Sequence, residues 1–176
     1  MASYLTRARG KDARPVWLAR VDNPLPESLP DSAANWAKAS EFDAKPGSLL
    51  LLPGEGGEIA GALFGCGNES PDERLVFGRL AAGLPDGNWY FANQPAEPEL
   101  AALGYLLGGY RFGRYKKTRE RNVTLACPEG ADAERIIHFA QSAFLARDLI
   151  NTPANDMCPN EIEGAARAVA KIGKAK

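Results

Sequence analysis

The spacing of apolar side chains is clearest in the second half of the chain. Leu100, Leu103, Leu107 and Tyr110 recur at steps of three and four residues, which predicts a helix with one buried face. Residues 122–127 then form a short apolar run that ends at a turn of proline and glycine, which predicts a strand. This half of the chain is therefore expected to alternate between helix and strand.

A second, longer helix is predicted after this strand, over residues 131–150. Ile137, Ala140 and Phe144 form its expected core stripe. The helix must end before Pro153, because proline disfavours helical geometry in the residue that precedes it.

The first half of the chain predicts shorter elements. The apolar run 48–52 is continuous, as in strands that are buried on both faces. It is separated by a turn of proline and glycine residues from a second run, 58–64, and this arrangement is typical of a β-hairpin. The other elements expected are strands at residues 16–21 and 89–91 and helices at residues 32–42, with Ser32 as N-cap, and 72–82. The helix that contains Leu100 and Tyr110 is expected to cover residues 97–110.

Strands that alternate with helices predict an α/β domain in which a sheet is flanked by helices. The hairpin makes this sheet mixed rather than purely parallel. The stretch before residue 16 contains four basic side chains, and we interpret it as a frayed terminus rather than as a transit peptide.

A last helix is predicted to begin at Pro159, where the missing N–H of proline costs nothing. Its narrow apolar stripe consists of Ile162, Ala166, Val169 and Ile172. A helix of about fourteen residues is marginal when it stands alone in water. We therefore expect residues 160–176 to be more mobile than the body of the protein, or to dock on a neighbouring molecule.

Composition places the chain among ordinary globular proteins. Its 176 residues have a net charge of −1 and a charged fraction of 24%, so strong attraction to nucleic acid or anionic lipid is not expected. Three cysteines lie far apart and offer no disulfide framework, which is typical of reduced thiols in the cytoplasm. No apolar run approaches the ~20 residues that a membrane helix needs, so we expect no membrane partner.

Few residues have the chemistry of a site. The glycines of residues 54–57 and 65–67 do not follow a phosphate-binding spacing, and they suit a hairpin turn and close sheet packing. His138 is the one histidine and has no second ligand one helical turn away. Cys127 and Cys158 have no recognisable catalytic partner. The sequence therefore predicts no catalytic, cofactor-binding or metal-binding residue.

Cationic side chains crowd the segment 111–121. They are Arg111, Arg114, Lys116, Lys117, Arg119 and Arg121, interleaved with Phe112 and Tyr115. Aromatic rings among cations can bind a phosphate or a single nucleic-acid strand. The same pattern suits a helix C-terminus, where cations complement the dipole and the aromatic rings anchor the core. Because the whole chain is nearly neutral, we favour the helix C-terminus and consider nucleic acid an unlikely partner.

Two segments resemble the M17, or leucyl aminopeptidase, family. Residues 146–159 (ARDLINTPANDMCP) are similar to the segment that closes the N-terminal domain of that family and leads into a connecting helix. Residues 104–116 (GYLLGGYRFGRYK) resemble the family's helix that ends in a Tyr-x-Phe-x-x-Tyr-Lys pattern. Together with the elements between them, they extend the resemblance over about residues 100–172.

The resemblance implies a fold akin to the macro domain and a place in a homo-hexamer in the cytoplasm. It also implies a longer parent enzyme that removes N-terminal amino acids from peptides with two divalent metals, zinc or manganese, in a C-terminal catalytic domain. The metal-binding signatures of that domain, such as DTGG and NTDAEGR, do not occur here, so no family site residue maps onto this chain. We expect residues 1–152 to be the α/β domain and residues 153–176 to be the linker and the start of the connecting helix.

Two functions remain open. The first is a non-catalytic accessory domain that serves assembly and substrate access, with this chain as a piece of the larger enzyme. The second is a stand-alone macro-like module that binds a phosphate ligand or nucleic acid through the segment 111–121. Continuation of the reading frame into a domain rich in metal ligands would separate the two.

Overall fold

The computed structural model describes residues 4–68, 73–116 and 121–174. Within these ranges the strands are β1 (Leu5–Thr6), β2 (Arg14–Ala19), β3 (Leu49–Pro53), β4 (Ile59–Gly65), β5 (Gly87–Phe91) and β6 (Val123–Ala126). The helices are α1 (Asp31–Ala39), α2 (Phe77–Gly83), α3 (Pro98–Gly108), α4 (Ala133–Asn151) and α5 (Pro159–Ile172).

The strands form one mixed sheet in the order β1-β6-β5-β2-β4-β3. Every neighbouring pair is parallel except β3 and β4, which form the predicted antiparallel hairpin. Gly57 adopts a positive φ of 83° in the hairpin turn, a conformation that glycine reaches without steric cost. The predicted mixed α/β fold is thus confirmed.

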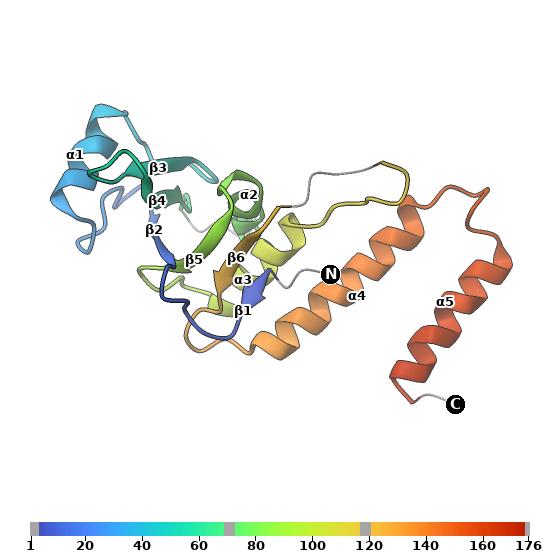
Figure 1. Ribbon diagram of the computed structural model, residues 1–176. Helices are drawn as coiled ribbons and strands as arrows, with labels where there is room; N and C mark the ends of the chain where they lie inside the picture. Colours follow the sequence, from blue (N-terminus) through green and yellow to red (C-terminus); the bar gives the residue numbers. More distant parts are fainter. Residues whose placement is uncertain (1–3, 69–72, 117–120, 175–176) are drawn as a thin grey trace.

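Helices cover both faces of the sheet (Figure 1). Along β4, Phe64 joins the larger core together with residues of α2, α3 and α4, while Leu63 joins a smaller core together with Ala37 of α1. Successive side chains of a strand point to opposite faces, so this alternation shows that the sheet separates two apolar clusters. Such a three-layer arrangement buries the strands of the sheet centre on both sides.

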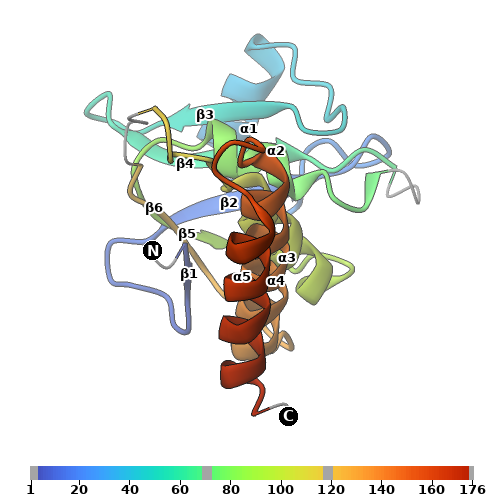
Figure 2. The same ribbon diagram turned by 90° about the vertical axis from the view of Figure 1, so that its right-hand side faces the viewer.

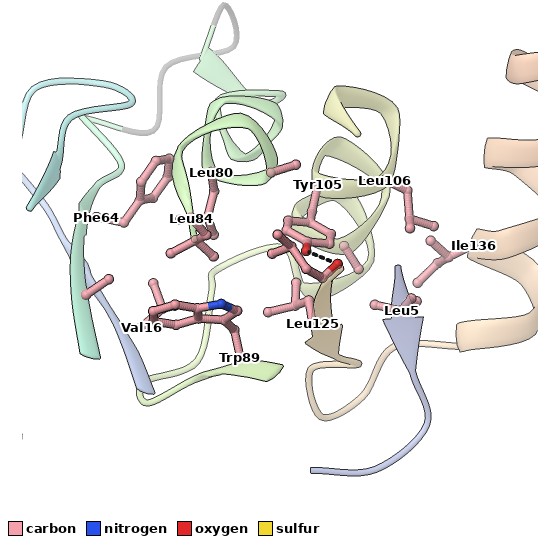
Figure 3. Packing of buried hydrophobic residues seen from close by; sticks show 14 of the residues in the cluster. Leu5, Val16, Phe64, Leu80, Leu84, Trp89, Tyr105, Leu106, Leu125 and Ile136 are labelled. Carbon is pink, nitrogen blue, oxygen red and sulfur yellow. Dashed lines mark hydrogen bonds between the residues drawn. The ribbon is translucent and has the colours of Figure 1, made fainter. Parts of the chain in front are cut away.

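The larger core is built around two wholly buried aromatic side chains that carry a polar atom, Trp89 of β5 and Tyr105 of α3 (Figure 3). Each aromatic side chain has a partner for its polar atom. The Trp89 indole N–H donates to the carbonyl oxygen of Pro85 at 3.1 Å, and the Tyr105 hydroxyl donates to that of Val123 at 3.1 Å. The core therefore buries large apolar area without leaving these donors unsatisfied.

Helices α2 and α3 contact each other through glycine. A Cβ atom added to Gly108 would lie 2.1 Å from the carbonyl oxygen of Gly78. Backbone cannot yield as a flexible side chain does, so this crossing requires a residue without a side chain at position 108. The close approach fixes the C-terminal end of α3, from which the segment 110–116 leaves.

The expected fraying of the N-terminal stretch is wrong for the described residues from Tyr4 onward. Leu5 is buried, and β1 pairs in parallel with β6. Arg7 forms an ion pair with Glu134 of α4, and the Arg9 guanidinium lies 3.4 Å from the centroid of the Tyr90 ring. This short strand escaped prediction because the strand that it pairs with lies more than a hundred residues away.

The expectation that residues 48–52 are buried on both faces is also wrong. β3 lies at the edge of the sheet, and Leu52 is its buried side chain, whereas Leu51 is exposed. The Trp36 indole N–H of α1 donates to the Leu51 carbonyl oxygen at 3.2 Å, and Pro53 has no N–H to offer. Both features block the open edge against further strand pairing.

Helix boundaries required smaller corrections. α1 begins after Pro30 and has no side-chain cap hydrogen bond, so Ser32 is not its N-cap. α2 begins at Phe77, later than expected, although residue 72 lies outside the described residues. In α4 the fully buried stripe contains Ile136, and Ile137 only packs against the core from its margin.

Helices α4 and α5 differ in their relation to the body. α4 packs on α3 and buries side chains in the larger core, whereas α5 lies beyond α4, on the side away from the sheet (Figures 1 and 2). No residue of α5, from 159 to 172, is buried. The apolar residues of the predicted stripe lie on this helix. Ile162, Val169 and Ile172 are 54%, 49% and 84% exposed, so the body of the protein does not cover them.

Candidate functional site

The two segments that resemble M17 enzymes contact each other. The Tyr110 hydroxyl, in the segment 104–116, donates to a carboxylate oxygen of Asp148 on α4, in the segment 146–159, at 2.7 Å. The side-chain amide of Asn151 donates to the same hydroxyl at 3.1 Å. The polar residues of the two segments thus have a structural role, since they join the loop after α3 to the end of α4.

A second tyrosine repeats this contact further along. The Tyr115 hydroxyl donates to the Asp156 carboxylate in the segment between α4 and α5, residues 152–158, which we name the exit segment. The hydrogen bond to Asp156 raises the pKa of Tyr115 above its ordinary value. Desolvation, followed by the hydrogen bond to Asp148, raises the pKa of Tyr110. Both phenols therefore remain protonated donors at neutral pH.

The exit segment is also held at its two ends. At its start, the buried Thr152 hydroxyl donates to the backbone carbonyl of Asp148 at 2.7 Å. At its end, the Cys158 amide donates to the Glu161 carboxylate at 3.0 Å, and this contact caps α5. These contacts fix where α4 stops and where α5 begins.

Two cations of the segment 111–121 bind carbonyl oxygens at helix C-termini, as expected for part of this segment. Arg111 donates to the carbonyl oxygen of Gly108 at 3.0 Å, at the end of α3. Arg121 donates to the carbonyl oxygen of Ala82 at 2.5 Å, at the end of α2. These carbonyls lack helical partners, and the guanidinium groups satisfy them. Lys117 and Arg119 lie outside the described residues.

The expected role of Tyr115 as a core anchor is wrong. Its side chain is 53% exposed, and its ring lies 5.8 Å from the Phe112 ring and also 5.8 Å from the Arg114 guanidinium carbon. The ring leaves the core because its hydroxyl reaches the Asp156 carboxylate.

The candidate histidine and cysteines lie apart from one another. His138 is exposed on α4. Burial raises the pKa of the half-buried Cys127 thiol, which donates to the Ala131 carbonyl at 3.5 Å. Cys158 is exposed, Cys66 is buried, and all three thiols are free. The fold therefore does not join His138 to either candidate nucleophile.

The described residues hold neither a cluster of metal ligands nor a membrane-spanning helix. Within residues 4–68, 73–116 and 121–174, no three His, Cys, Asp or Glu side chains gather where they could hold a metal ion. None of the helices in the described part of the chain combines the length and the apolar character needed to cross a lipid bilayer.

Sequence reasoning missed a cavity of about 150 Å³ at the carboxyl ends of the central strands. Leu18, Cys66, Asn93, Phe77 and Glu97 are among the side chains that line it. A signal was available, because Arg20, Asn68 and Asn93 each follow a strand closely and bring polar groups to one edge of the sheet. Parallel pairing, which the sequence does not reveal, is what brings these strand ends together.

Comparisons with known proteins agree with the geometry. The family model described as "M17 aminopeptidase, N-terminal domain" matches residues 15–128. The chain therefore belongs to the M17 aminopeptidase family, as an N-terminal domain.

Curated relatives are named as probable cytosol aminopeptidases. A probable cytosol aminopeptidase of Aeropyrum pernix is 29% identical over 156 residues, which cover 80% of this chain and 31% of the relative. A probable cytosol aminopeptidase of Bradyrhizobium is 31% identical over 170 residues, which cover 78% of this chain and 33% of the relative. The chain thus spans about a third of the length of these relatives.

Solved structures show the same fold. The cytosol aminopeptidase of Coxiella burnetii matches with a TM-score of 0.83 and 29% identity, over 98% of this chain and 38% of that enzyme. The bottromycin maturation enzyme BotP, also solved in complex with Mn, matches at 21% identity with a TM-score of 0.67, over 92% of this chain and 38% of that chain. α5 falls within the region that the Coxiella enzyme matches, because that match covers nearly the whole chain.

Proposed function

We propose that this chain is a non-catalytic accessory domain of a metallo-aminopeptidase and serves its assembly and substrate access. The whole enzyme would release N-terminal amino acids from peptides with two divalent metals, zinc or manganese, held by another domain. Residues 1–152 would form the accessory body and residues 153–176 the connection to the catalytic domain. We extend the proposal to a cytoplasmic homo-hexamer, the assembly that the family resemblance implies.

The exposed apolar side chains on the outer helices are the observation that carries this proposal. α5 exposes Ile162, Val169 and Ile172, and α4 exposes Phe139 and Ile150, which are 58% and 81% exposed. A helix of this length gains most of its stability from packing an apolar face. A stripe that its own domain leaves uncovered indicates a partner surface. Relatives about three times as long contain chain that can supply such a surface.

The acidic side chains with known partners serve the structure. Glu99 pairs with Arg135, Asp132 caps α4, and Asp148 and Asp156 accept from tyrosine hydroxyls. Two-metal hydrolysis requires carboxylates that converge on cations ~3.5–4 Å apart. Carboxylates committed to arginine, tyrosine and backbone donors support a scaffold role better than a catalytic one.

The stand-alone binding module is the less favoured function. Arg111 and Arg121 donate to helix carbonyl oxygens, so these guanidinium groups already have acceptors. We expect only loose, salt-sensitive binding of nucleic acid at physiological ionic strength. Sub-micromolar binding that is lost when Arg114 and Lys116 are neutralised would instead favour the module.

An exchange of domains tests the proposal. This chain replaces the matching segment of the Coxiella burnetii cytosol aminopeptidase, and a second variant lacks the segment altogether. We expect the chimera to keep the oligomeric state of the parent and to hydrolyse a leucyl amide with manganese or zinc, while the deletion variant loses both. The isolated chain should show no metal-dependent hydrolysis. Turnover by the pure isolated chain that a chelator abolishes would contradict the non-catalytic role.

A further inference from the structure

The cavity of about 150 Å³ lies where the direction of the sheet topology changes. β2 pairs with β4 on one side and with β5 on the other, and all three strands are parallel. In open parallel sheets, ligands bind in the crevice outside the carboxyl ends of the strands at such a switch point. Here the lining includes Arg20 after β2, Cys66 after β4 and Asn93 after β5.

The cavity has an apolar floor and a charged rim. The floor contains Leu18, Cys66 and Ala101, which are buried, beside the ring of Phe77. The rim includes Arg74 and Glu97, whose side chains are 57% and 58% exposed. Their charged atoms are 3.9 Å apart, at the outer limit of an ion pair, so neither group is firmly held by the other.

Size and backbone geometry disfavour a nucleotide or phosphate ligand. Drug-sized and cofactor ligands occupy pockets of about 300–1,000 Å³, which is well above the volume available here. The backbone N–H groups that could hold a phosphate at the strand ends have protein acceptors. The amide of Leu18 donates to the Asn93 side chain at 2.7 Å, and that of Cys66 donates to the Ala19 carbonyl at 2.7 Å. A smaller ligand that presents both charges fits better.

We propose that this cavity binds a free apolar α-amino acid of about the size of leucine. The side chain would lie on the floor, the carboxylate would face Arg74, and the ammonium group would face Glu97. This site does not depend on the proposed accessory role, because it uses only residues of the α/β body.

Nuclear magnetic resonance titration of the full chain tests the site. L-leucine should shift the amide signals of Asn93, Glu97 and Leu100 with a Kd on the order of 1 mM, as expected for so small a ligand. Leucinamide lacks the carboxylate and 4-methylpentanoic acid lacks the ammonium group. Each should bind about tenfold more weakly or worse, because each loses one charge-assisted contact with the rim. A nucleoside diphosphate should not compete with leucine.

Exposed variants identify the site without disturbing the fold. Arg74→Gln and Glu97→Gln should each weaken leucine binding by about tenfold. Arg114→Gln is the matched control, because it removes an exposed guanidinium that lies over Tyr115 rather than at the cavity. Three results would each overturn the site: no saturable shift at tens of millimolar leucine, unchanged affinity in both rim variants, or a nucleoside diphosphate that binds more tightly than leucine.

Discussion

Helices α4 and α5 follow each other in the chain and yet behave differently. α4 buries Ile136, Ala140 and Phe144 in the larger core, while α5 buries no residue between 159 and 172. α5 has the more regular apolar stripe of the two in the sequence, with Ile162, Ala166, Val169 and Ile172 at helical spacing. An apolar stripe therefore shows that a helix needs a partner, but does not show where that partner lies.

The exit segment explains how two such helices can adjoin. The hydrogen bond from Tyr115 to Asp156 holds the segment, and the one from Tyr110 to Asp148 holds the end of α4 just before it, against the loop that follows α3. The chain then turns away from the body, and these contacts set the direction in which α5 leaves. Stability is thus concentrated in the body, and α5 depends on local contacts.

Hydrogen exchange gives the largest expected contrast between the two helices. Amides of residues 136–147 should open only by near-global unfolding, whereas amides of 163–172 should open by local fraying. In dilute monomer we expect α5 to exchange on the order of 10³-fold faster or more. Equal protection of both helices in a concentration-independent monomer would show that α5 belongs to the core of this domain.

Substitution of one isoleucine in each helix measures the same contrast as a change in the free energy of unfolding. Ile136 is 2% exposed and Ile172 is 84% exposed. Ile136→Ala should lower the free energy of unfolding by about 2–5 kcal/mol, because it leaves a cavity in the core. Ile172→Ala should change it by less than about 0.5 kcal/mol. Urea denaturation followed by circular dichroism measures both, and a large loss for Ile172→Ala would contradict an uncovered α5.

Deletion of a single hydroxyl at the end of α4 should destabilise the exit segment that begins there. Tyr110→Phe removes the donor to Asp148, and we expect a loss of about 1 kcal/mol together with faster exchange of the amides in residues 152–158. Tyr90→Phe on β5 is the matched control, since Tyr90 stacks with Arg9 outside this segment. Unchanged exchange in Tyr110→Phe would show that the hydroxyl does not hold the exit segment.

Among these perturbations, alkaline pH should have the smallest effect on the stability of this segment, and only at high pH. The pKa of Tyr110 is raised above its ordinary value of 10.0, first by desolvation and then by the hydrogen bond to Asp148. The protonated phenol is thus favoured in the folded state. Its contribution is complete below pH 10.0 and is lost as the pH rises through the folded-state pKa. Phenolate absorbance should show one late-titrating group fewer in Tyr110→Phe than in the parent chain.

The sequence by itself determined most elements and the family. The spacing of Leu100, Leu103 and Leu107 predicted α3, and Pro153 predicted the end of α4. These features depend on neighbours within a few residues, so they can be read locally. The family motif could likewise be recognised from the sequence, but the hydrogen bonds that its residues form could not be predicted from it.

Tertiary structure alone decided which elements meet. Parallel pairing of β1 with β6 ordered a terminus that looked frayed, and the place of β3 at the sheet edge exposed a strand that looked buried. Parallel pairing of β2 with β4 and with β5 assembled the cavity at the switch point of the sheet from residues 18 to 101. Such contacts join residues tens to more than a hundred positions apart. Local spacing cannot specify them, because the free energy that selects them comes from burial in the complete fold.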